Sequence, residues 1–240
     1  MSVLSLPPGW ESNEITKFFD SARNNEIATF ANHQIWVTRL SDIDLGYRKS
    51  IEGVNYTHNW FPVFFLHRAH SNFLAACRLC WSAQIPECHA LLRSCLENAI
   101  YGLYLDKHPD SFETWLKRGE NNAAKQKVRD EFKIPAILKL ITAEHAEEGE
   151  AAKKLYEWTI DSGAHPNEQA LMQTLTMDRN GDQIKFMSKY LDPGSVAQTA
   201  ALKSTAEVGE CTLSLFQIVY PERFDLMGVS DLLSRAKNGL

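Results

Sequence analysis

The 240-residue sequence lacks the features that mark membrane, secreted and strongly basic nucleic-acid-binding proteins. Its longest strongly apolar run, residues 61–66, is far shorter than the roughly 20 residues that a membrane-spanning helix needs. The N-terminus has no basic start followed by an apolar core, so we expect no signal peptide and a cytoplasmic location. A formal charge of −5 argues against a large nucleic-acid surface, although a local basic groove stays compatible with it.

The sequence also lacks the short motifs of well-known catalytic sites. It has no glycine-rich phosphate loop, nucleophile elbow or dinucleotide-binding fingerprint. The Glu-x-x-His motif of di-iron helical bundles and the His-Glu-x-x-His motif of zinc proteases are absent as well. We therefore expect no metal and no cofactor, and the motifs leave open whether the protein is an enzyme.

Cysteine is scarce and odd in number, which disfavours a disulfide framework. The five are Cys77, Cys80, Cys88, Cys95 and Cys211. Four of them fall within predicted helices, and we expect reduced thiols in the core. Cys77-x-x-Cys80 followed by Cys88-His89 has the composition of a zinc site. However, structural zinc sites usually place a cysteine pair on a loop, and the first pair here lies within a helix, so core packing is the simpler interpretation.

Helical periodicity, by contrast, extends along most of the chain. Two consecutive apolar helices, residues 60–84 and 86–106, are joined by a short turn, which makes them antiparallel neighbours. The first has apolar side chains on every side, which is typical of a buried helix. Asn24 and Asn25 predict an interruption in the N-terminal helical segment, and Gly149 predicts a break in a later one. We predict an all-α fold in one domain, residues 1–240: an irregular multi-helix bundle around the two buried helices.

One segment departs from this helical pattern. Residues 171–177 and 183–187 alternate apolar and polar side chains and flank Asn180-Gly181. Asn-Gly between alternating segments is a strong signal for a two-stranded hairpin. We predict a small β-hairpin near residues 171–187, and we expect it to pack on the helices because an isolated ribbon is not stable in water.

Ionisable residues inside the two apolar helices point to a polar site or to internal scaffolding. They are His67, Arg68, His70, Arg78, Arg93 and Glu97. Because burying a charge is costly, such groups either satisfy one another or line a pocket. Arg93 and Glu97 share one helix face, in the order that is weaker for a simple surface pair, which suggests partners on other helices. They form a structural clamp, or Arg93 anchors an anion and Glu97 acts as a base or acceptor.

Histidines supply the other candidate side chains. His67 and His70 are spaced for metal binding, but no third ligand is evident, so satisfied core histidines are the alternative. His165 follows the predicted capping glycine, Gly163, and precedes Pro166, in a loop that starts near Asp161. A helix C-terminus favours its imidazolium form, which suits a proton donor or an anion contact, and a simple helix cap is the other interpretation.

The segment CRLCWSAQIPECHALLRSCLENAIYGLYL, together with the later YEWTIDSGAHPNE, resembles the DUF5677-like family of bacterial all-helical proteins. In that family a helix with Leu-Leu-Arg, and a Glu four residues after the Arg, precedes a His near a helix end. The resemblance covers residues 65–170 and implies Arg93, Glu97 and His165 as positions of interest. It also implies a similarity to HEPN-type proteins and hence a role with RNA or in phage defence. The Arg-x4–6-His element of HEPN ribonucleases is absent from this chain.

Three functions follow as hypotheses. The first is a cytoplasmic binding or interaction protein, in which Arg93, Glu97, His67, His70 and His165 converge on a small anionic ligand or a side chain of a protein partner. The second is a metal-independent hydrolase or nuclease acting on RNA or phosphoesters. In it His165 is the acid or base, with Glu97 or Asp161 alongside. The third is a structural subunit of an oligomer such as a homodimer, with an apolar face between copies.

Overall fold

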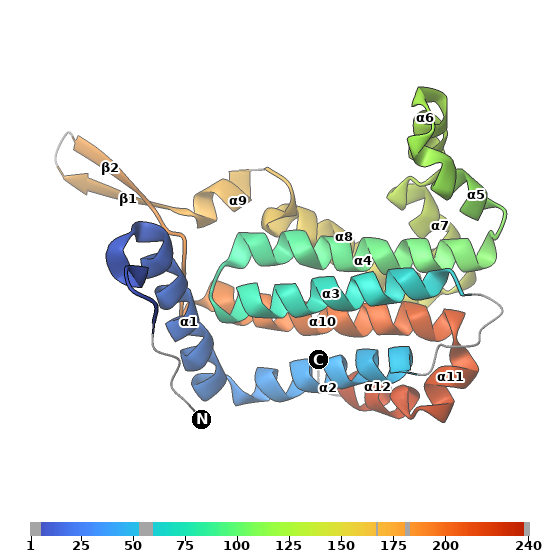
Figure 1. Ribbon diagram of the computed structural model, residues 1–240, viewed down its shortest axis with the longest axis horizontal. Helices are drawn as coiled ribbons and strands as arrows, with labels where there is room; N and C mark the ends of the chain where they lie inside the picture. Colours follow the sequence, from blue (N-terminus) through green and yellow to red (C-terminus); the bar gives the residue numbers. More distant parts are fainter. Residues whose placement is uncertain (1–5, 53–59, 167, 181–182, 238–240) are drawn as a thin grey trace.

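Long helices lying side by side form the body of the computed structural model, and a β-ribbon projects from one end (Figure 1). The structure describes residues 6–52, 60–166, 168–180 and 183–237. The main helices are α1 (Glu14–Asn32), α2 (Gln34–Glu52), α3 (Pro62–Trp81), α4 (Ile85–Lys107), α8 (Ala146–Thr159) and α10 (Val196–Val219). The shorter ones are α5 (Ser111–Leu116), α6 (Asn122–Glu131), α7 (Ile134–Glu144), α9 (Glu168–Gln173), α11 (Pro221–Leu226) and α12 (Val229–Lys237). Single turns are η1 (Trp10–Ser12), η2 (Lys117–Gly119) and the π-helical η3 (Ile160–Ala164), and the strands are β1 (Leu175–Asn180) and β2 (Gln183–Ser188). The all-α prediction with a small hairpin is confirmed.

Helices α3 and α4 are the predicted antiparallel pair, and they begin and end within three residues of the predicted bounds. The turn between them is tight because Ala83 adopts a left-handed conformation with φ 67°. Cys80, Cys88 and Cys95 are fully buried in the core, and burial raises the pKa of Cys95 to about 11, which keeps its thiol protonated. The five cysteines are free, as expected for reduced core thiols.

Helix α10 is a third central helix, and almost all of its middle is buried. Small residues let its neighbours approach closely. At Gly209 a Cβ atom would lie 2.6 Å from a ring carbon of Phe73 and 2.8 Å from Ile43. Any side chain there would therefore push α2 and α3 away from α10.

Helix α3 is less buried than its composition predicts. One stripe along it faces solvent, including Phe64 at 59% exposure and Leu74 at 40%. His67, Arg68 and Arg78 lie on this exposed stripe, so these three charged or polar groups are hydrated. The prediction of burial on all sides was wrong, because α3 packs on α1, α2, α4 and α10 but side chains such as Phe64 and Leu74 stay exposed.

Two helix breaks also differ from the prediction. The N-terminal segment is interrupted at His33, between α1 and α2, and Asn24 and Asn25 lie within α1. The later break falls at His145, and Gly149 is a buried position inside α8. A Cβ atom at Gly149 would lie 2.5 Å from the Cα atom of Thr142, so this glycine permits close packing of α7 on α8.

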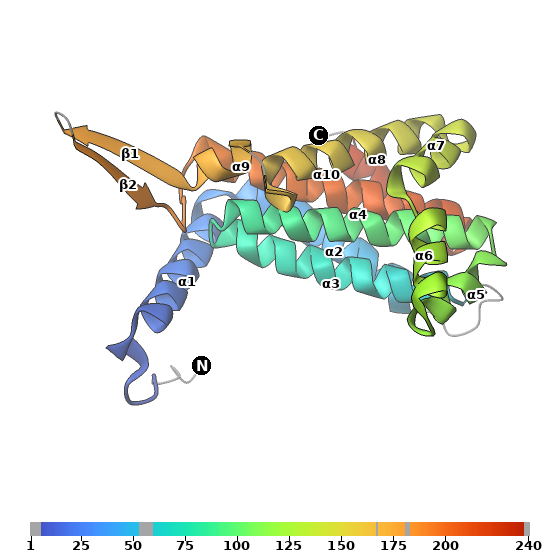
Figure 2. The same ribbon diagram turned by 90° about the horizontal axis from the view of Figure 1, so that it is seen from above.

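The hairpin forms where the sequence predicts it, but it does not pack on the bundle. Its strands pair antiparallel with Met177 opposite Phe186. Figure 2 shows the ribbon extending away from the helices, at the end of the molecule where α1 also projects. Every strand residue whose side chain is described is exposed. The expectation of packing was wrong, because the ribbon's apolar side chains meet no helix face.

No helix in the described part of the chain combines the length and the apolar character that crossing a membrane requires.

Candidate functional site

Arg93 and Glu97 form a small cluster with a tyrosine from another helix. On α4, Nε of Arg93 donates to Oε1 of Glu97 at 2.9 Å. Tyr156 on α8 completes the cluster, since its hydroxyl accepts from Nη2 of Arg93 at 3.0 Å and donates to Oε1 of Glu97 at 3.3 Å. The guanidinium also lies over the Tyr156 ring, 5.2 Å from the ring centroid.

The electrostatics of the cluster raise the pKa of both Tyr156 and Arg93. Burial raises the pKa of Tyr156, and the Glu97 carboxylate raises it further against the opposing effect of Arg93. Burial alone would lower the pKa of Arg93, but Glu97 and Tyr156 outweigh it and hold that pKa above its usual value. The side chains of Arg93 and Glu97 are only 27% and 28% exposed. The cluster therefore joins α4 to α8 as a charged clamp.

His70 belongs to a different cluster, between α2 and α3. Its Nε2 lies 2.6 Å from Oδ1 of Asp44, and the other oxygen of Asp44 accepts from Arg48 at 2.7 Å. Burial tends to raise the pKa of Asp44, but hydrogen bonds from Arg48 and His70 outweigh it and lower that pKa overall. The imidazole stacks on Tyr47 with 5.0 Å between ring centroids. In Figures 1 and 2, α3 and α8 lie on opposite sides of α4.

The remaining candidate histidines are exposed. His67 is on the solvent-facing stripe of α3. His165 follows η3, and its Nδ1 lies 3.3 Å from the carbonyl oxygen of Pro166. Among the described residues, no hydrogen bond or ion pair joins His67, His70 or His165 to Arg93 or Glu97. The predicted convergence on one anion pocket does not occur, because the helix faces that carry these groups point in different directions.

The most buried histidine among the described residues is not one of the predicted site residues. His89 is 3% exposed on α4, and its Nδ1 lies 2.9 Å from the carbonyl oxygen of Ile85, so Nδ1 carries the proton that this bond needs. Its Nε2 is buried and forms no hydrogen bond in the described part of the chain. Burial lowers the pKa of His89, and the bond to Ile85 offsets this only in part.

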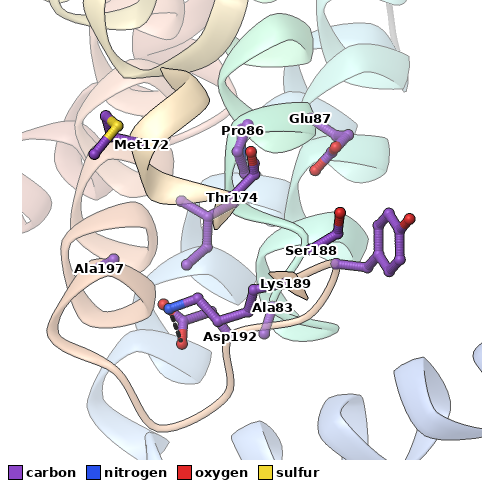
Figure 3. Close-up of a pocket in the computed structure, with 11 residues that line it drawn as sticks. Ala83, Pro86, Glu87, Met172, Thr174, Ser188, Lys189, Asp192 and Ala197 are labelled. Atoms are coloured by element: carbon purple, nitrogen blue, oxygen red, sulfur yellow. Dashed lines mark ion pairs between the residues drawn. The ribbon is translucent and has the colours of Figure 1, made fainter. Parts of the chain in front are cut away.

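A first cavity lies at the base of the hairpin (Figure 3). Its volume is about 430 Å³, and it is bounded by the start of α4, the end of α9 and the chain that leads from β2 into α10. An ion pair between Lys189 and Asp192, 3.0 Å long, lies on its wall. Because these two charges neutralise each other, no unpaired charge from this pair is left to select a charged ligand.

A larger groove of about 840 Å³ runs between α8 and α10. Trp158, Leu155 and Ala151 contribute apolar surface to it, and Nε1 of Trp158 donates to Oγ of Ser204 at 3.0 Å across the two helices. Trp158 is 43% exposed. Ser214 also borders the groove and is 6% exposed, and its hydroxyl is buried without a hydrogen-bond partner among the described residues.

The groove is strongly acidic. Its carboxylates are Glu147, Glu148, Glu157, Asp161, Glu207 and Glu210. The lining also contains two lysines, Lys154 and Lys203. Nζ of Lys203 lies 3.7 Å from Oε1 of Glu207. The lining thus carries a formal charge of −4, while the whole chain carries −5. Asp161, a predicted ligand-binding residue, is part of this acidic lining, and His165 is not.

The sequence contains a signal for the groove that motif searching does not use. Acidic and apolar residues recur at helical spacing over 147–161, on the face of α8 that borders α10. Tyr156 has no such signal, because its partners Arg93 and Glu97 are about 60 positions away in the chain.

Within the part of the chain that the structure describes, no group of three or more histidine, cysteine or carboxylate side chains is arranged to hold a metal ion. Comparisons with protein-family models, curated proteins and solved structures found no match to this chain. The resemblance to the DUF5677-like family therefore stays a prediction.

Proposed function

We propose that this protein is a helical interaction protein that binds a positively charged amphipathic helix of a partner in the groove between α8 and α10. The observation that carries the proposal is the combination of an apolar floor at Trp158 with an acidic lining of charge −4. A helix laid in a groove is a common mode of peptide recognition, with apolar anchors at successive turns.

The dimensions of the groove favour a helix over a small cation. Its wall on α8 and η3 extends over residues 147–161, which corresponds to about 21 Å at 1.5 Å per residue. A partner helix of about four turns matches this length. Such a helix would place leucine-like side chains on Trp158 and Leu155, and lysine or arginine side chains beside Glu147 and Glu157.

The charge of the groove favours a cationic ligand over the small anionic ligand that the sequence predicts. An anion would be repelled by six carboxylates, whereas a cationic partner would be attracted and its association accelerated. No observation favours the hydrolase hypothesis to the same degree, because His165 is exposed and outside the groove.

The test is calorimetric titration with a defined probe, a leucine–lysine peptide of about 14 residues designed as an amphipathic helix. The double variant Glu147→Lys/Glu157→Lys reverses two exposed charges of the groove. Exposed ion pairs contribute up to about 1 kcal/mol each, so we expect binding to weaken about tenfold or more. The control Glu120→Lys/Glu131→Lys makes the same charge change at residues outside the groove.

The control variant should bind the peptide as the unmodified protein does, after allowance for the small effect of net charge. A second peptide with the same composition in a non-amphipathic order should bind at least tenfold more weakly. Equal losses in both double variants, or equal binding of both peptides, would show non-specific charge attraction and would overturn the proposal.

A further inference from the structure

A basic projection, residues 117–133, stands at the end of the molecule opposite the ribbon. It contains η2 and α6, and Figure 1 shows α6 clear of the long helices of the bundle. Helix α6 packs on η2 and α5. The side chains at positions 125–130 are exposed apart from Val128. Most of the surface of α6 is therefore accessible to another molecule.

The basic projection differs in charge from the rest of the chain. It contains six basic and three acidic side chains, a formal charge of +3, whereas the whole chain carries −5. Lys125 and Arg129 lie four positions apart and share one face of α6, and neither forms an ion pair among the described residues. The carboxylate of Asp130 is engaged by Lys133 at 3.1 Å. Helix α6 thus presents positive charge that nothing in the described part of its own chain neutralises.

The α8–α10 groove is complementary to this projection in charge and length. Its lining carries a formal charge of −4, and Glu147 and Glu157 in it are exposed. Helix α6 has ten residues, which corresponds to about 15 Å, so it is shorter than the groove wall of about 21 Å. Leu116 directly precedes the projection and is 61% exposed, and Trp158 in the groove is 43% exposed, so each side also offers one apolar surface.

Contact between the two surfaces requires two copies of the chain, because within one copy α6 packs on η2 and α5. Charge also selects which surfaces meet. Two acidic grooves repel each other, and so do two basic projections, whereas a projection and a groove attract.

We propose that the basic projection of one copy binds in the α8–α10 groove of a second copy, so that the chain associates head to tail. This interface uses the groove of the proposed function and therefore rests on it, with α6 of another copy as the cationic helix. Lys125 and Arg129 lie beside the carboxylates of α8. The interface joins two different surfaces, so it is heterologous and forms rings or open chains. Because each exposed ion pair contributes little, the association is weak and depends on salt.

Sedimentation velocity of the full chain tests the proposal at low- and high-micromolar concentration. We expect a monomer at the lower concentration and larger species at the higher one. These species should dissociate in about 0.5 M salt, which screens the charges. Lys125→Glu/Arg129→Glu reverses charges of the projection and should stay monomeric. The matched control is Arg23→Glu/Arg235→Glu, which makes the same charge change at exposed residues of α1 and α12 and should associate as the unmodified protein does.

A mixture of two variants isolates a single native contact. Lys125→Glu/Arg129→Glu keeps the native groove, and Glu147→Lys/Glu157→Lys keeps the native projection. Each variant alone should be monomeric. Their mixture should give one-to-one dimers and nothing larger, because the two altered surfaces no longer attract each other. Excess leucine–lysine peptide should dissociate these dimers, since it occupies the same groove.

Three outcomes would overturn the proposal. The first is an unmodified protein that is monomeric at high-micromolar concentration in low salt. The second is a mixture of the two variants that stays monomeric, because the interface would then lie elsewhere. The third is a monomeric protein that binds mixed-sequence single-stranded RNA and loses this binding in Lys125→Glu/Arg129→Glu, because the projection would then serve a nucleic acid. The proposed function fails separately, if the leucine–lysine peptide does not bind at low-micromolar concentration, where we expect a monomer.

Discussion

Replacing Tyr156 with phenylalanine removes a single oxygen atom from the clamp between α4 and α8. That oxygen accepts from Arg93 and donates to Glu97, at 3.0 and 3.3 Å. The phenyl ring stays in place, so the cation–π contact with Arg93 is retained. The substitution thus isolates the two hydrogen bonds that cross between the helices.

The expected loss follows from the charge and exposure of the partners. Hydrogen bonds to charged groups contribute about 1.5–3 kcal/mol each when buried. Arg93 and Glu97 are about one quarter exposed and keep their own ion pair, so solvent replaces part of what is lost. We expect Tyr156→Phe to lower the free energy of unfolding by about 1–2 kcal/mol, which corresponds to a fall in Tm of about 3–6 °C for a chain of this size.

Urea denaturation measures the loss, with Tyr104→Phe as the control. Tyr104 packs in the same way through its ring, but its hydroxyl forms no hydrogen bond in the described part of the chain. The control should change stability by less than about 0.5 kcal/mol. If the loss of stability in Tyr156→Phe is as small as in the control, the cluster is not a structural clamp. The same conclusion follows if Tyr156→Phe leaves stability unchanged but weakens binding of the leucine–lysine peptide.

Two further predictions concern α4 and the turn that packs on it. The pKa of His89 is lowered in the folded state, so below the usual value of about 6.5 the unfolded chain binds more protons. The contribution to stability is therefore full above that pH and is lost as the pH falls below it. Urea unfolding above and below that pH should show a smaller pH effect for His89→Gln than for the unmodified protein, and an identical effect would contradict the assignment. At Gly163, where φ is 139°, a Cβ atom would lie 2.7 Å from Cα of Pro86, so Gly163→Ala should destabilise by about 2 kcal/mol or more. A Cβ atom at Gly119 would have no heavy atom within 4 Å, so the stability of Gly119→Ala should be within about 0.5 kcal/mol of that of the unmodified protein. Equal melting temperatures for the two variants would refute the steric argument.

Local signals in the sequence predict the elements of this fold well. The period of the apolar residues locates α3 and α4, because this signal comes from residues within one or two turns. Asn180-Gly181 predicts the hairpin for the same reason. These local signals do not predict which side chains are buried. Whether Phe64 on α3 is covered depends on which helices pack there, and that is decided by contacts distant in sequence.

The candidate site depends even more on contacts between residues that are distant in sequence. Arg93 and Glu97 do interact, as their spacing indicates, but the residue that explains them is Tyr156 on α8. His70 and His165 have the right chemistry for the predicted pocket, yet the packing of α3 and the position of η3 keep them elsewhere. The α8–α10 groove arises only when two amphipathic faces from different parts of the chain are aligned, so the pattern over residues 147–161 does not by itself predict the groove.

Chemical-shift mapping of the tryptophan side chains tests the proposed function most directly. The chain has six tryptophans, each with an indole N–H resonance, and Trp158→Phe identifies the resonance of Trp158 by its absence. Addition of the amphipathic leucine–lysine peptide should shift the Trp158 resonance, because its indole lies in the groove, and should leave Trp60 unchanged because it is outside the groove. A shift at Trp60 with none at Trp158 would contradict binding between α8 and α10.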